Sequence, residues 1–310
     1  MSHRLITRAV KENDREGMME TTGKIVKGVG GLYQVYVEDL GPVNCRAKGI
    51  LRYNGTRPLV GDDVRLTVIG QNEGNITEIL PRRNSLIRPA VANVDQAMIV
   101  FAVRDPEPHL NLLDRFLLWM QTEQVPVVIC FNKTDKATEE ELKRFERIYR
   151  GSGATVVFSK ANDANSMDGV YQALLGKTTV LAGPSGVGKS TIMNYANPSA
   201  CAETGELSEK IMRGRNTTRH STLMYVTKDT YLCDTPGFSS LFLPEMKPEE
   251  LDLYYPEFAD YRDQCRFPDC AHKKEPGCAV KEALEAGRIE PERYESYSVL
   301  YDELVSAKKR

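Results

Sequence analysis

The sequence predicts an α/β protein in three parts: a small closed β-barrel, a larger domain built on a mostly parallel sheet, and a helical module that holds a metal ion. Three observations predict this arrangement. Short apolar runs punctuated by glycine crowd the first 80 residues, strand-like and helix-like segments alternate from residue 95, and three cysteines gather with one histidine near the end. These patterns belong to different architectures, so we expect more than one domain.

The composition is that of an ordinary globular protein. The chain has 310 residues, of which 41% are apolar and 27% charged, so it can build at least one large core. No run approaches the roughly 18 apolar residues of a membrane span, and the first residues lack the apolar stretch of a signal peptide. We therefore expect a cytoplasmic protein with no membrane partner. Cys130 and Cys233 fall in apolar, strand-like runs, which favours buried thiols over a disulfide framework.

Positive charge is concentrated in two regions, although the net charge is −2. Residues 21–90 carry ten Lys or Arg against six Asp or Glu, and residues 208–230 carry five against two. Such regions could serve a polyanionic partner. Charge alone nevertheless favours the simpler interpretation, a solvated surface.

Residues 1–20 read as a polar arm, and residues 21–82 as the barrel. The strand-like runs are GKIVKG, LYQVYVED, VNCRAKG, DDVRLTVIG and GNITEIL. Five short strands in under 60 residues predict a small closed barrel of the OB kind. Such barrels bind single-stranded or looped RNA, or only pack against a neighbouring domain. The segment PRRNSLIRP, with Arg82, Arg83 and Arg88, is expected to be a linker.

Residues 83–240 are expected to form the α/β domain, and residues 241–310 the helical module, which ends in a helix near 291–307. The expected strands are QAMIVFAV, PVVICF, ATVVFS, TTVLAG, a weaker TLMYVT, and TYLCD. Because most of them are apolar along their length, the sheet should be mostly parallel and covered on both faces. The expected helices span 109–124, 138–150, 166–175 and 188–197.

A phosphate-binding loop follows the strand TTVLAG and opens a helix, the context that the G-x-x-x-x-G-K-[ST] motif requires. Backbone N–H groups and the helix N-terminus would surround the phosphates. Lys189 should reach the β- and γ-phosphates, and Ser190 should ligate Mg²⁺. The flanking strand and helix disfavour a chance match in a surface loop. The predicted nucleotide-binding residues of this loop are Gly183, Pro184, Ser185, Gly186, Val187, Gly188, Lys189, Ser190 and Thr191.

A second motif, Asn132-Lys133-Thr134-Asp135, selects the base. It ends an apolar strand, where α/β sheets place their ligands. The Asp135 carboxylate can accept hydrogen bonds from guanine N1–H and the exocyclic amine, whereas adenine has no donor at either position. Unmade bonds to a charged group cost on the order of 1.5–3 kcal/mol, which favours GTP. Ser159 and Lys160, after the next strand, form the candidate loop beneath guanine, in the order Ser-Lys-Ala instead of the usual Ser-Ala-Lys.

A third motif, DTPG, supplies the magnesium and γ-phosphate contacts. Asp234 would hold Mg²⁺ through water, and the Gly237 N–H would meet the γ-phosphate. The loop RGRNTTRHST offers Thr217 or Thr218 as the threonine that closes over Mg²⁺, and the sequence leaves open which of the two does so.

The residues that assist hydrolysis are the least defined part of the predicted site. Ras-like enzymes place a water-orienting glutamine after DxxG, whereas this chain has Phe238, which cannot play that part. Asn216 could orient a water, and His220 could orient it or take its proton. Hydrolysis by the free protein is therefore expected to be slow.

The motifs stand in an unusual order, with the base-reading NKTD ahead of the phosphate loop. In Ras-like GTPases the phosphate loop comes first. A site that closes in space tolerates this change if the original termini are joined and new ones open elsewhere. The sequence therefore predicts a circularly permuted GTPase domain.

The cysteine-rich segment predicts one structural zinc ion. Cys265, Cys270, His272 and Cys278 stand within fourteen residues, and the residues between them are polar and turn-forming. Three thiolates and one imidazole complete a tetrahedral zinc site with no position left for water. Buried cysteines without a metal fit this polar stretch poorly.

Together these features resemble the family of ribosome small-subunit-dependent GTPase A (RsgA, also called YjeQ or YloQ). The resemblance covers roughly residues 20–310 and rests on RPAVANVDQ, NKTD, GPSGVGKST, RGRNTTRH, DTPGFSS and the Cys/His spacing. It implies a monomeric bacterial factor in late maturation of the small ribosomal subunit, whose GTP or GDP state controls association and release. It also implies contact with 16S rRNA through the barrel and zinc domains, subunit-stimulated hydrolysis, and no DNA partner.

One position departs from the family pattern. The switch of the family usually reads G-x-H-T-T, with a histidine proposed to assist hydrolysis, whereas Asn216 stands there in this chain. His220 lies four residues later, and the sequence does not decide between them. Two other functions remain to be compared: an RNA-binding scaffold with a degenerate nucleotide pocket, which the intact motifs disfavour, and an ATP-using kinase, which NKTD disfavours.

Overall fold

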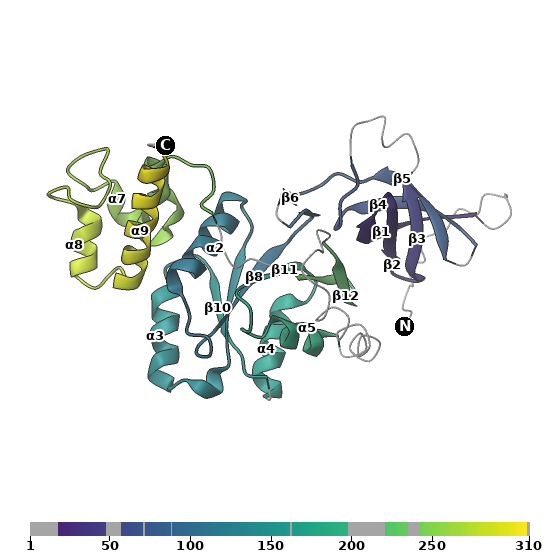
Figure 1. Ribbon diagram of the computed structural model, residues 1–310, viewed down its shortest axis with the longest axis horizontal. Coiled ribbons are helices and arrows are strands. Elements are labelled where there is room, and N and C mark those ends of the chain that lie inside the picture. The colour runs from purple at the N-terminus through teal and green to yellow at the C-terminus, as the bar shows by residue number, and fades with distance from the viewer. Residues whose placement is uncertain are drawn as a thin grey trace, which may run out of the picture. The chain divides into compact units, whose positions relative to one another are not determined.

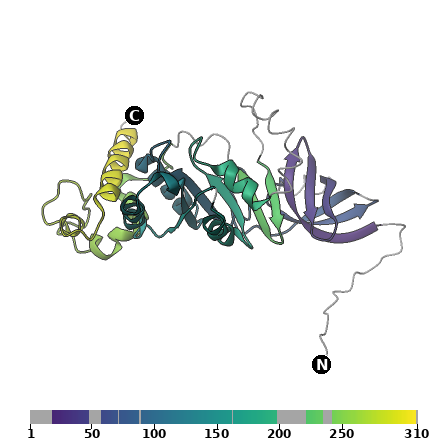
Figure 2. The same ribbon diagram turned by 90° about the horizontal axis from the view of Figure 1, so that it is seen from below.

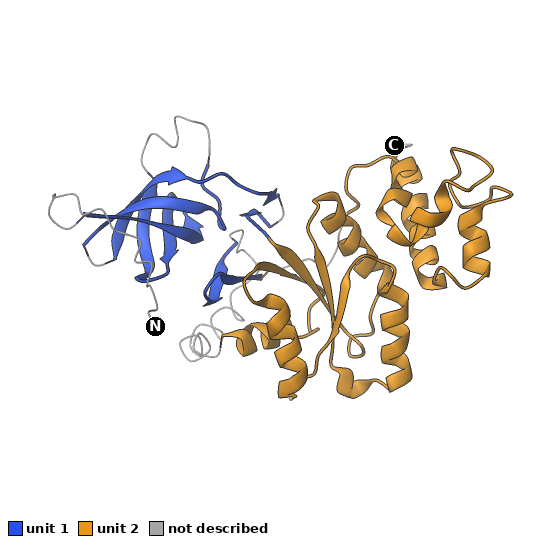
Figure 3. Ribbon diagram, turned by 180° about the vertical axis from the view of Figure 1, so that it is seen from behind, with its two compact units in different colours: residues 1–94, 216–233 blue, residues 95–215, 234–310 orange. Residues whose placement is uncertain are grey.

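The structure, a computed structural model, describes residues 18–47, 57–70, 72–87, 89–161, 163–197, 221–234 and 242–308. The chain divides into two compact units: residues 1–94 with 216–233, and residues 95–215 with 234–310 (Figure 3). The first unit is therefore discontinuous in sequence, because a segment from beyond the phosphate loop joins it. The domain boundaries after residues 20, 82 and 240 stay predictions.

The first unit contains a closed five-stranded barrel, which confirms the sequence prediction. Its strands close in the order β1-β2-β3-β5-β4 (Figure 1), and only β3 and β5 run parallel. Alternation along each strand sends every second residue into the barrel core, as Val35 and Val37 on β2 illustrate. The strands are β1 (Met18–Val29), β2 (Leu32–Val37), β3 (Gly41–Ala47), β4 (Asp63–Ile69) and β5 (Glu73–Ile79). The first residues of β1 thus fall inside the segment expected to be an arm.

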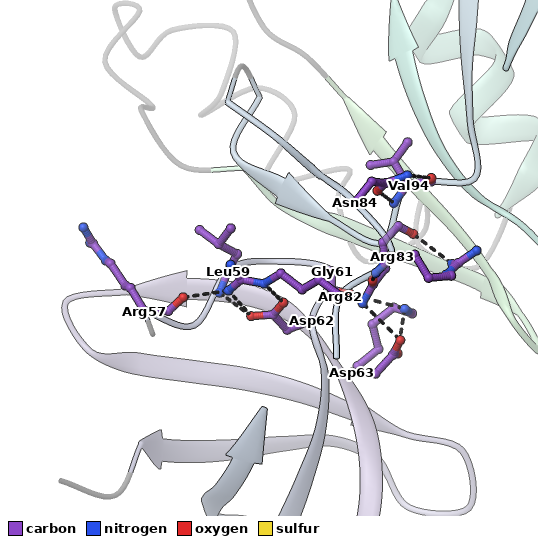
Figure 4. Close-up of polar contacts among 11 residues, drawn as sticks. Arg57, Leu59, Gly61, Asp62, Asp63, Arg82, Arg83, Asn84 and Val94 are labelled. Atoms are coloured by element: carbon purple, nitrogen blue, oxygen red, sulfur yellow. Dashed lines mark hydrogen bonds and ion pairs between the residues drawn. The ribbon is translucent and has the colours of Figure 1, made fainter. Parts of the chain in front are cut away.

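The segment after the barrel, expected to be a linker, is a structured hairpin tied to the barrel. Its strands are β6 (Ser85–Leu86) and β7 (Val91–Ala92). Arg82 donates to both carboxylate oxygens of the fully buried Asp62, at 2.6 and 2.8 Å (Figure 4). A bidentate pair of this kind fixes the orientation of the two side chains as well as their distance. The sequence did not predict an ordered hairpin because the partner of Arg82 lies twenty residues earlier.

The same junction depends on a close backbone approach at Gly61. A Cβ at this position would lie 2.1 Å from the carbonyl oxygen of Ala92, and the φ angle of Gly61 is +91°. Only glycine accommodates both conditions. The buried Asn93 side chain completes the junction, since its amide donates to Gly61 O and Asp63 Oδ2, both at 3.1 Å.

The hairpin formed by β12 (Leu223–Thr227) and β13 (Thr230–Asp234) confirms the two strands expected there. The strands pair antiparallel, with Tyr225 opposite Tyr231. Residues 221–233 of this hairpin belong to the same compact unit as the barrel. Their predicted place in the GTPase domain stays a prediction.

The second unit contains four parallel strands in the order β10-β9-β8-β11, flanked by helices (Figure 1). Every residue of β8, β9 and β11 is buried, which explains their unbroken apolar character. The strands are β8 (Gln96–Ala102), β9 (Val127–Asn132), β10 (Thr155–Phe158) and β11 (Thr178–Ala182). The helices are α2 (Leu110–Thr122), α3 (Glu139–Tyr149), α4 (Ala164–Leu174) and α5 (Lys189–Ala196), all four of which the sequence predicted.

The C-terminal module packs against α2 and α3 through its long helix α9, which Figure 2 shows in yellow. Its own core gathers aromatic and aliphatic side chains from several short elements, among them Tyr255, Phe258 and Tyr297. The elements are η2 (Pro248–Tyr254), η3 (Pro256–Phe258), α7 (Ala259–Arg262), α8 (Ala279–Glu285) and α9 (Pro291–Lys308). None of the helices in the described part of the chain has the length and apolarity that a bilayer span needs.

Candidate functional site

The phosphate-binding loop links β11 to α5, and two of its glycines are required by close packing. A Cβ on Gly183 would lie 2.1 Å from the carbonyl oxygen of Val100, and one on Gly188 would lie 2.1 Å from Nδ2 of Asn132. Both residues also adopt positive φ angles, +137° and +104°. The loop therefore lies against β8 and the end of β9, with its backbone in a conformation that other residues rarely adopt.

Lys189 is held inside this loop. Its ammonium group donates to the carbonyl oxygens of Gly183 and Pro184, each at 2.8 Å. Burial lowers the pKa of the Lys189 amine, and the Asp234 carboxylate opposes that shift. Phosphate oxygens would give this cation stronger, charge-assisted partners than two neutral carbonyls do. Ser190 and Thr191 follow at the exposed start of α5.

Asn132 joins the base motif to the phosphate loop. It is the last residue of β9 and only 3% exposed. Its Nδ2 donates to the carbonyl oxygen of Val187 at 2.9 Å, and its Oδ1 accepts from the Ser159 hydroxyl at 2.9 Å. The two motifs thus meet through one side-chain amide, between residues that are 55 positions apart in the sequence.

Ser159 is fully buried, with its hydroxyl between Asn132 and the thiol of Cys130, which lies 3.2 Å away. Its hydroxyl orients the Asn132 amide, a role that the sequence did not reveal. The only available signal was its place after a strand next to β9. Contact of Ser159 and Lys160 with the nucleotide stays a prediction.

Asp135 lies in a one-turn 3-10 helix, Thr134–Lys136, directly after Asn132 and Lys133. Its side chain is exposed. The backbone N–H of Thr134 donates to the Ser159 carbonyl at 3.2 Å, so the two loops expected to flank the base are adjacent. Lys133 adopts a left-handed conformation, with φ of +62°.

The loop that contains Asp105, which the sequence did not predict as part of the site, contacts the base motif. The Lys133 ammonium donates to the carbonyl oxygen of Asp105, and the Lys136 ammonium forms an ion pair of 2.6 Å with the Asp105 carboxylate. The hydrogen bond with Lys136 lowers the pKa of Asp105. Nothing in the sequence near Asp105 marks it, because its partners lie about thirty residues later.

Five predicted site residues lie outside the described residues: Asn216, Thr217, Thr218, His220 and Gly237. Asp234, the first residue of the DTPG motif, is described and ends β13. The predicted roles of these residues therefore rest on sequence.

The cysteine-rich segment forms a compact donor set. One ligand atom from each of four side chains lies within 4.8 Å of all the others, and the residues are Cys265, Cys270, His272 and Cys278. The Nδ1 atom of His272 is 3.5 Å from Sγ of Cys265 and 3.4 Å from Sγ of Cys278. The cluster could hold a metal ion, as predicted.

The surroundings of His272 orient its ring toward the three sulfurs. The residue is 1% exposed, and its Nε2 lies 3.6 Å from the Asp252 carboxylate, on the side away from the thiols. Metal-ligating histidines commonly direct their second nitrogen at such a carboxylate. Burial raises the pKa of the Cys270 thiol to about 12. Only a cation would make several thiolates stable together here, so the donor set fits a tetrahedral metal ion.

Two family profiles match the chain. The one described as "RsgA GTPase" matches residues 79–244, and the one described as "RsgA N-terminal domain" matches residues 22–76. A protein of Agathobacter rectalis is 46% identical over 300 residues, which is 93% of this chain and 99% of the relative. A protein of Alkaliphilus metalliredigens is 45% identical over 284 residues, covering 91% and 97%. Both relatives are named small ribosomal subunit biogenesis GTPase RsgA.

Two solved structures are similar to this chain over nearly its whole length. YjeQ from Thermotoga maritima matches with a TM-score of 0.77 and 34% identity, covering 93% of this chain and 99% of that one. YloQ, described as a circularly permuted GTPase, matches with a TM-score of 0.77 and 35% identity, covering 97% and 99%. The predicted permuted fold is therefore confirmed.

Proposed function

We propose a function from one established premise: this chain belongs to the RsgA GTPase family. It is a circularly permuted GTPase, and it hydrolyses GTP in the biogenesis of the small ribosomal subunit. The observation that carries the proposal is the hydrogen bond from the Asn132 amide to the Val187 carbonyl. It locks a guanine-reading motif to a phosphate-binding loop, as one nucleotide site requires.

Guanine selection is assigned to Asp135. Asp135→Asn should weaken GTP binding and favour xanthosine triphosphate, because the C2 oxygen of xanthine needs a donor where guanine needs an acceptor. Losing bonds to a charged group costs on the order of 1.5–3 kcal/mol, or roughly 10- to 150-fold in Kd. Equilibrium titration with both nucleotides measures the change. Asp163→Asn, at the start of α4, is a matched control that should leave both affinities unaltered, and an unchanged GTP affinity in Asp135→Asn would remove this residue from the base site.

Two metals complete the proposed chemistry. Magnesium would be bound with GTP by Ser190, by Asp234 through water, and by Thr217 or Thr218, and it would neutralise charge that develops on the transferring phosphoryl group. Zinc would be bound once per chain by Cys265, Cys270, His272 and Cys278. Its role is structural, since four protein ligands leave no position for water.

The proposed partner is the small subunit, contacted through its 16S rRNA. An open groove of about 680 Å³ on the barrel is lined by two cationic side chains, one acidic side chain, one aromatic ring and several apolar side chains, and a cationic groove with an aromatic ring suits a nucleic-acid chain. Its lining includes Lys27, Val29, Leu32, Tyr33, Arg46 and Ile69. We expect the protein to act in the cytoplasm as a monomer, to bind no DNA, and to associate and dissociate according to its GTP or GDP state.

Single-turnover hydrolysis with and without small subunits tests this function. Subunits should raise the rate at least about tenfold, because completing a site in trans can supply roughly 10³–10⁵ in rate. The loss of stimulation in Asn216→Ala or His220→Ala would show which residue assists. Rapid hydrolysis by the free protein, or no response to subunits, would contradict the proposal.

Co-sedimentation of the same samples at two salt concentrations tests the RNA contact. Arg46→Glu should weaken association and flatten its salt dependence, since each phosphate contact contributes to the slope. Its GTP affinity should match that of the wild type. Equal association of the wild type and Arg46→Glu would mean that the groove is not the RNA-binding surface.

A further inference from the structure

In the sequence, the hairpin of β12 and β13 lies between two segments that are predicted to contact the nucleotide and its magnesium ion. Thr218 precedes it, and Asp234 ends it. Residues 221–233 nevertheless belong to the compact unit of the barrel. The hairpin therefore connects the barrel to the segments that the proposed function assigns to the nucleotide, and the inference rests on that function.

Three tyrosines join the hairpin to the barrel, and we call them the tyrosine cluster: Tyr36, Tyr225 and Tyr231. Tyr36 alternates on β2 with Val35 and Val37, which face the barrel core, so its ring points outward. There it stacks on Tyr225, with ring centroids 3.8 Å apart and an interplanar angle of 18°. Tyr231 presents its edge to both, at 6.3 Å from Tyr36 and 5.7 Å from Tyr225.

Two contacts of charged groups and one backbone bridge also join the hairpin to the barrel. The Lys24 ammonium lies 5.6 Å from the centroid of the Tyr231 ring, and Lys228 forms an ion pair of 3.2 Å with Glu38. A backbone bridge joins Lys27 of β1 to Thr222. Desolvation and the hydrogen bond with Tyr225 raise the pKa of Tyr36 to about 12, so the ring stays neutral across the physiological range.

The arrangement has a geometry suited to coupling. Tyr225 of β12 is paired with Tyr231 of β13, so a contact that fixes the Tyr225 ring restrains both strands of the hairpin. Tyr231 is only 7% exposed and lies three residues before Asp234, whose carboxylate acts on the Lys189 ammonium. A displacement of the hairpin relative to the barrel would break the stack of Tyr36 on Tyr225. The last residue of the displaced hairpin is Asp234.

We propose that the tyrosine cluster couples the barrel to GTP hydrolysis, with Tyr36, Tyr225 and Tyr231 as positioning residues. RNA bound to the barrel would hold the hairpin, whose last residue is Asp234, in the arrangement that hydrolyses GTP. Coupling between two binding sites is reciprocal. The factor by which bound RNA alters the affinity for a nucleotide would therefore equal the factor by which that nucleotide alters the affinity of the barrel for RNA.

Alanine and phenylalanine variants of the cluster test the proposal in the full-length protein. Tyr225→Ala and Tyr36→Ala should each lose most of the stimulation by small subunits, which is expected to be at least about tenfold in the wild type. Their intrinsic hydrolysis rate and GTP affinity should match the wild type. Tyr225→Phe and Tyr36→Phe retain the ring and should retain the stimulation. A merely structural role would lower all three quantities together.

The outcomes separate this inference from the proposed function. If the wild type is stimulated and both alanine variants are stimulated equally, the cluster has no coupling role and the function stands. If the wild type itself shows no stimulation, the proposed function fails first.

Hydrogen exchange of the wild type gives a second measurement that does not depend on the variants folding. Amides of β2 should exchange at different rates with GDP and with a non-hydrolysable GTP analogue. Tyr225→Phe should preserve the difference. Identical exchange of β2 in the two nucleotide states of the wild type would overturn the proposal.

Discussion

Replacing Cys278 with alanine is expected to release the bound metal and unfold the C-terminal module. Cys278 is 3% exposed and directly precedes α8, so the metal would tie the start of this helix to the loop that carries Cys265 and His272. Structural zinc contributes about 10–16 kcal/mol in small zinc-binding domains, and that energy is folding energy. Metal content by mass spectrometry and thermal unfolding measure the two effects.

Cys45→Ala is the matched control, since Cys45 is also buried but lies on β3 of the barrel and is not a member of the donor set. It should keep one metal ion per chain. Addition of a chelator to the wild type should reproduce the behaviour of Cys278→Ala. If the metal-free protein unfolds with an unchanged midpoint, the metal has no structural role.

Arg293→Met is expected to destabilise the second unit by about 3–5 kcal/mol, because it leaves two carboxylates buried without their cation. Arg293 is 2% exposed and forms ion pairs with Asp114 of α2 and, at 2.7 Å, with Glu257 of η3. Its guanidinium also lies 4.6 Å from the centroid of the Tyr255 ring. Arg293 therefore links α9 both to α2 of the sheet domain and to η3 within the C-terminal module. Urea unfolding monitored by far-UV circular dichroism measures the loss.

Arg144→Met provides the comparison. Arg144 forms an ion pair with Glu292 at 2.7 Å, also between the sheet domain and α9, but half of its side chain is exposed. Exposed pairs contribute about 0–1 kcal/mol, so this variant should unfold close to the wild type. Equal stabilities of Arg293→Met and Arg144→Met would mean that burial of the Arg293 pairs adds nothing.

Features that follow a local rule could be predicted from the sequence. The short strand-like run LYQVYV predicted β2, and unbroken apolar runs predicted β8 and β9. Gly183 and Gly188 were found because a phosphate loop needs backbone angles that few residues adopt. The spacing of Cys265, Cys270, His272 and Cys278 predicted a donor set because the ligands are close in the chain. Each rule needs only a short window of residues.

Contacts between groups that are far apart in the chain could not be predicted and are seen in the folded protein. Arg293 and Asp114 are 179 positions apart, the Asn132 amide and the Val187 carbonyl are 55 apart, and no local pattern shows that either pair meets. The same holds for Tyr36, which alternation places on the outer face of β2 without indicating that Tyr225 is its partner. The physical reason is that a hydrogen bond, an ion pair or a ring stack depends on distances of a few ångströms. Those distances are set by how whole strands and helices pack, and the packing is recorded nowhere in a local stretch of sequence.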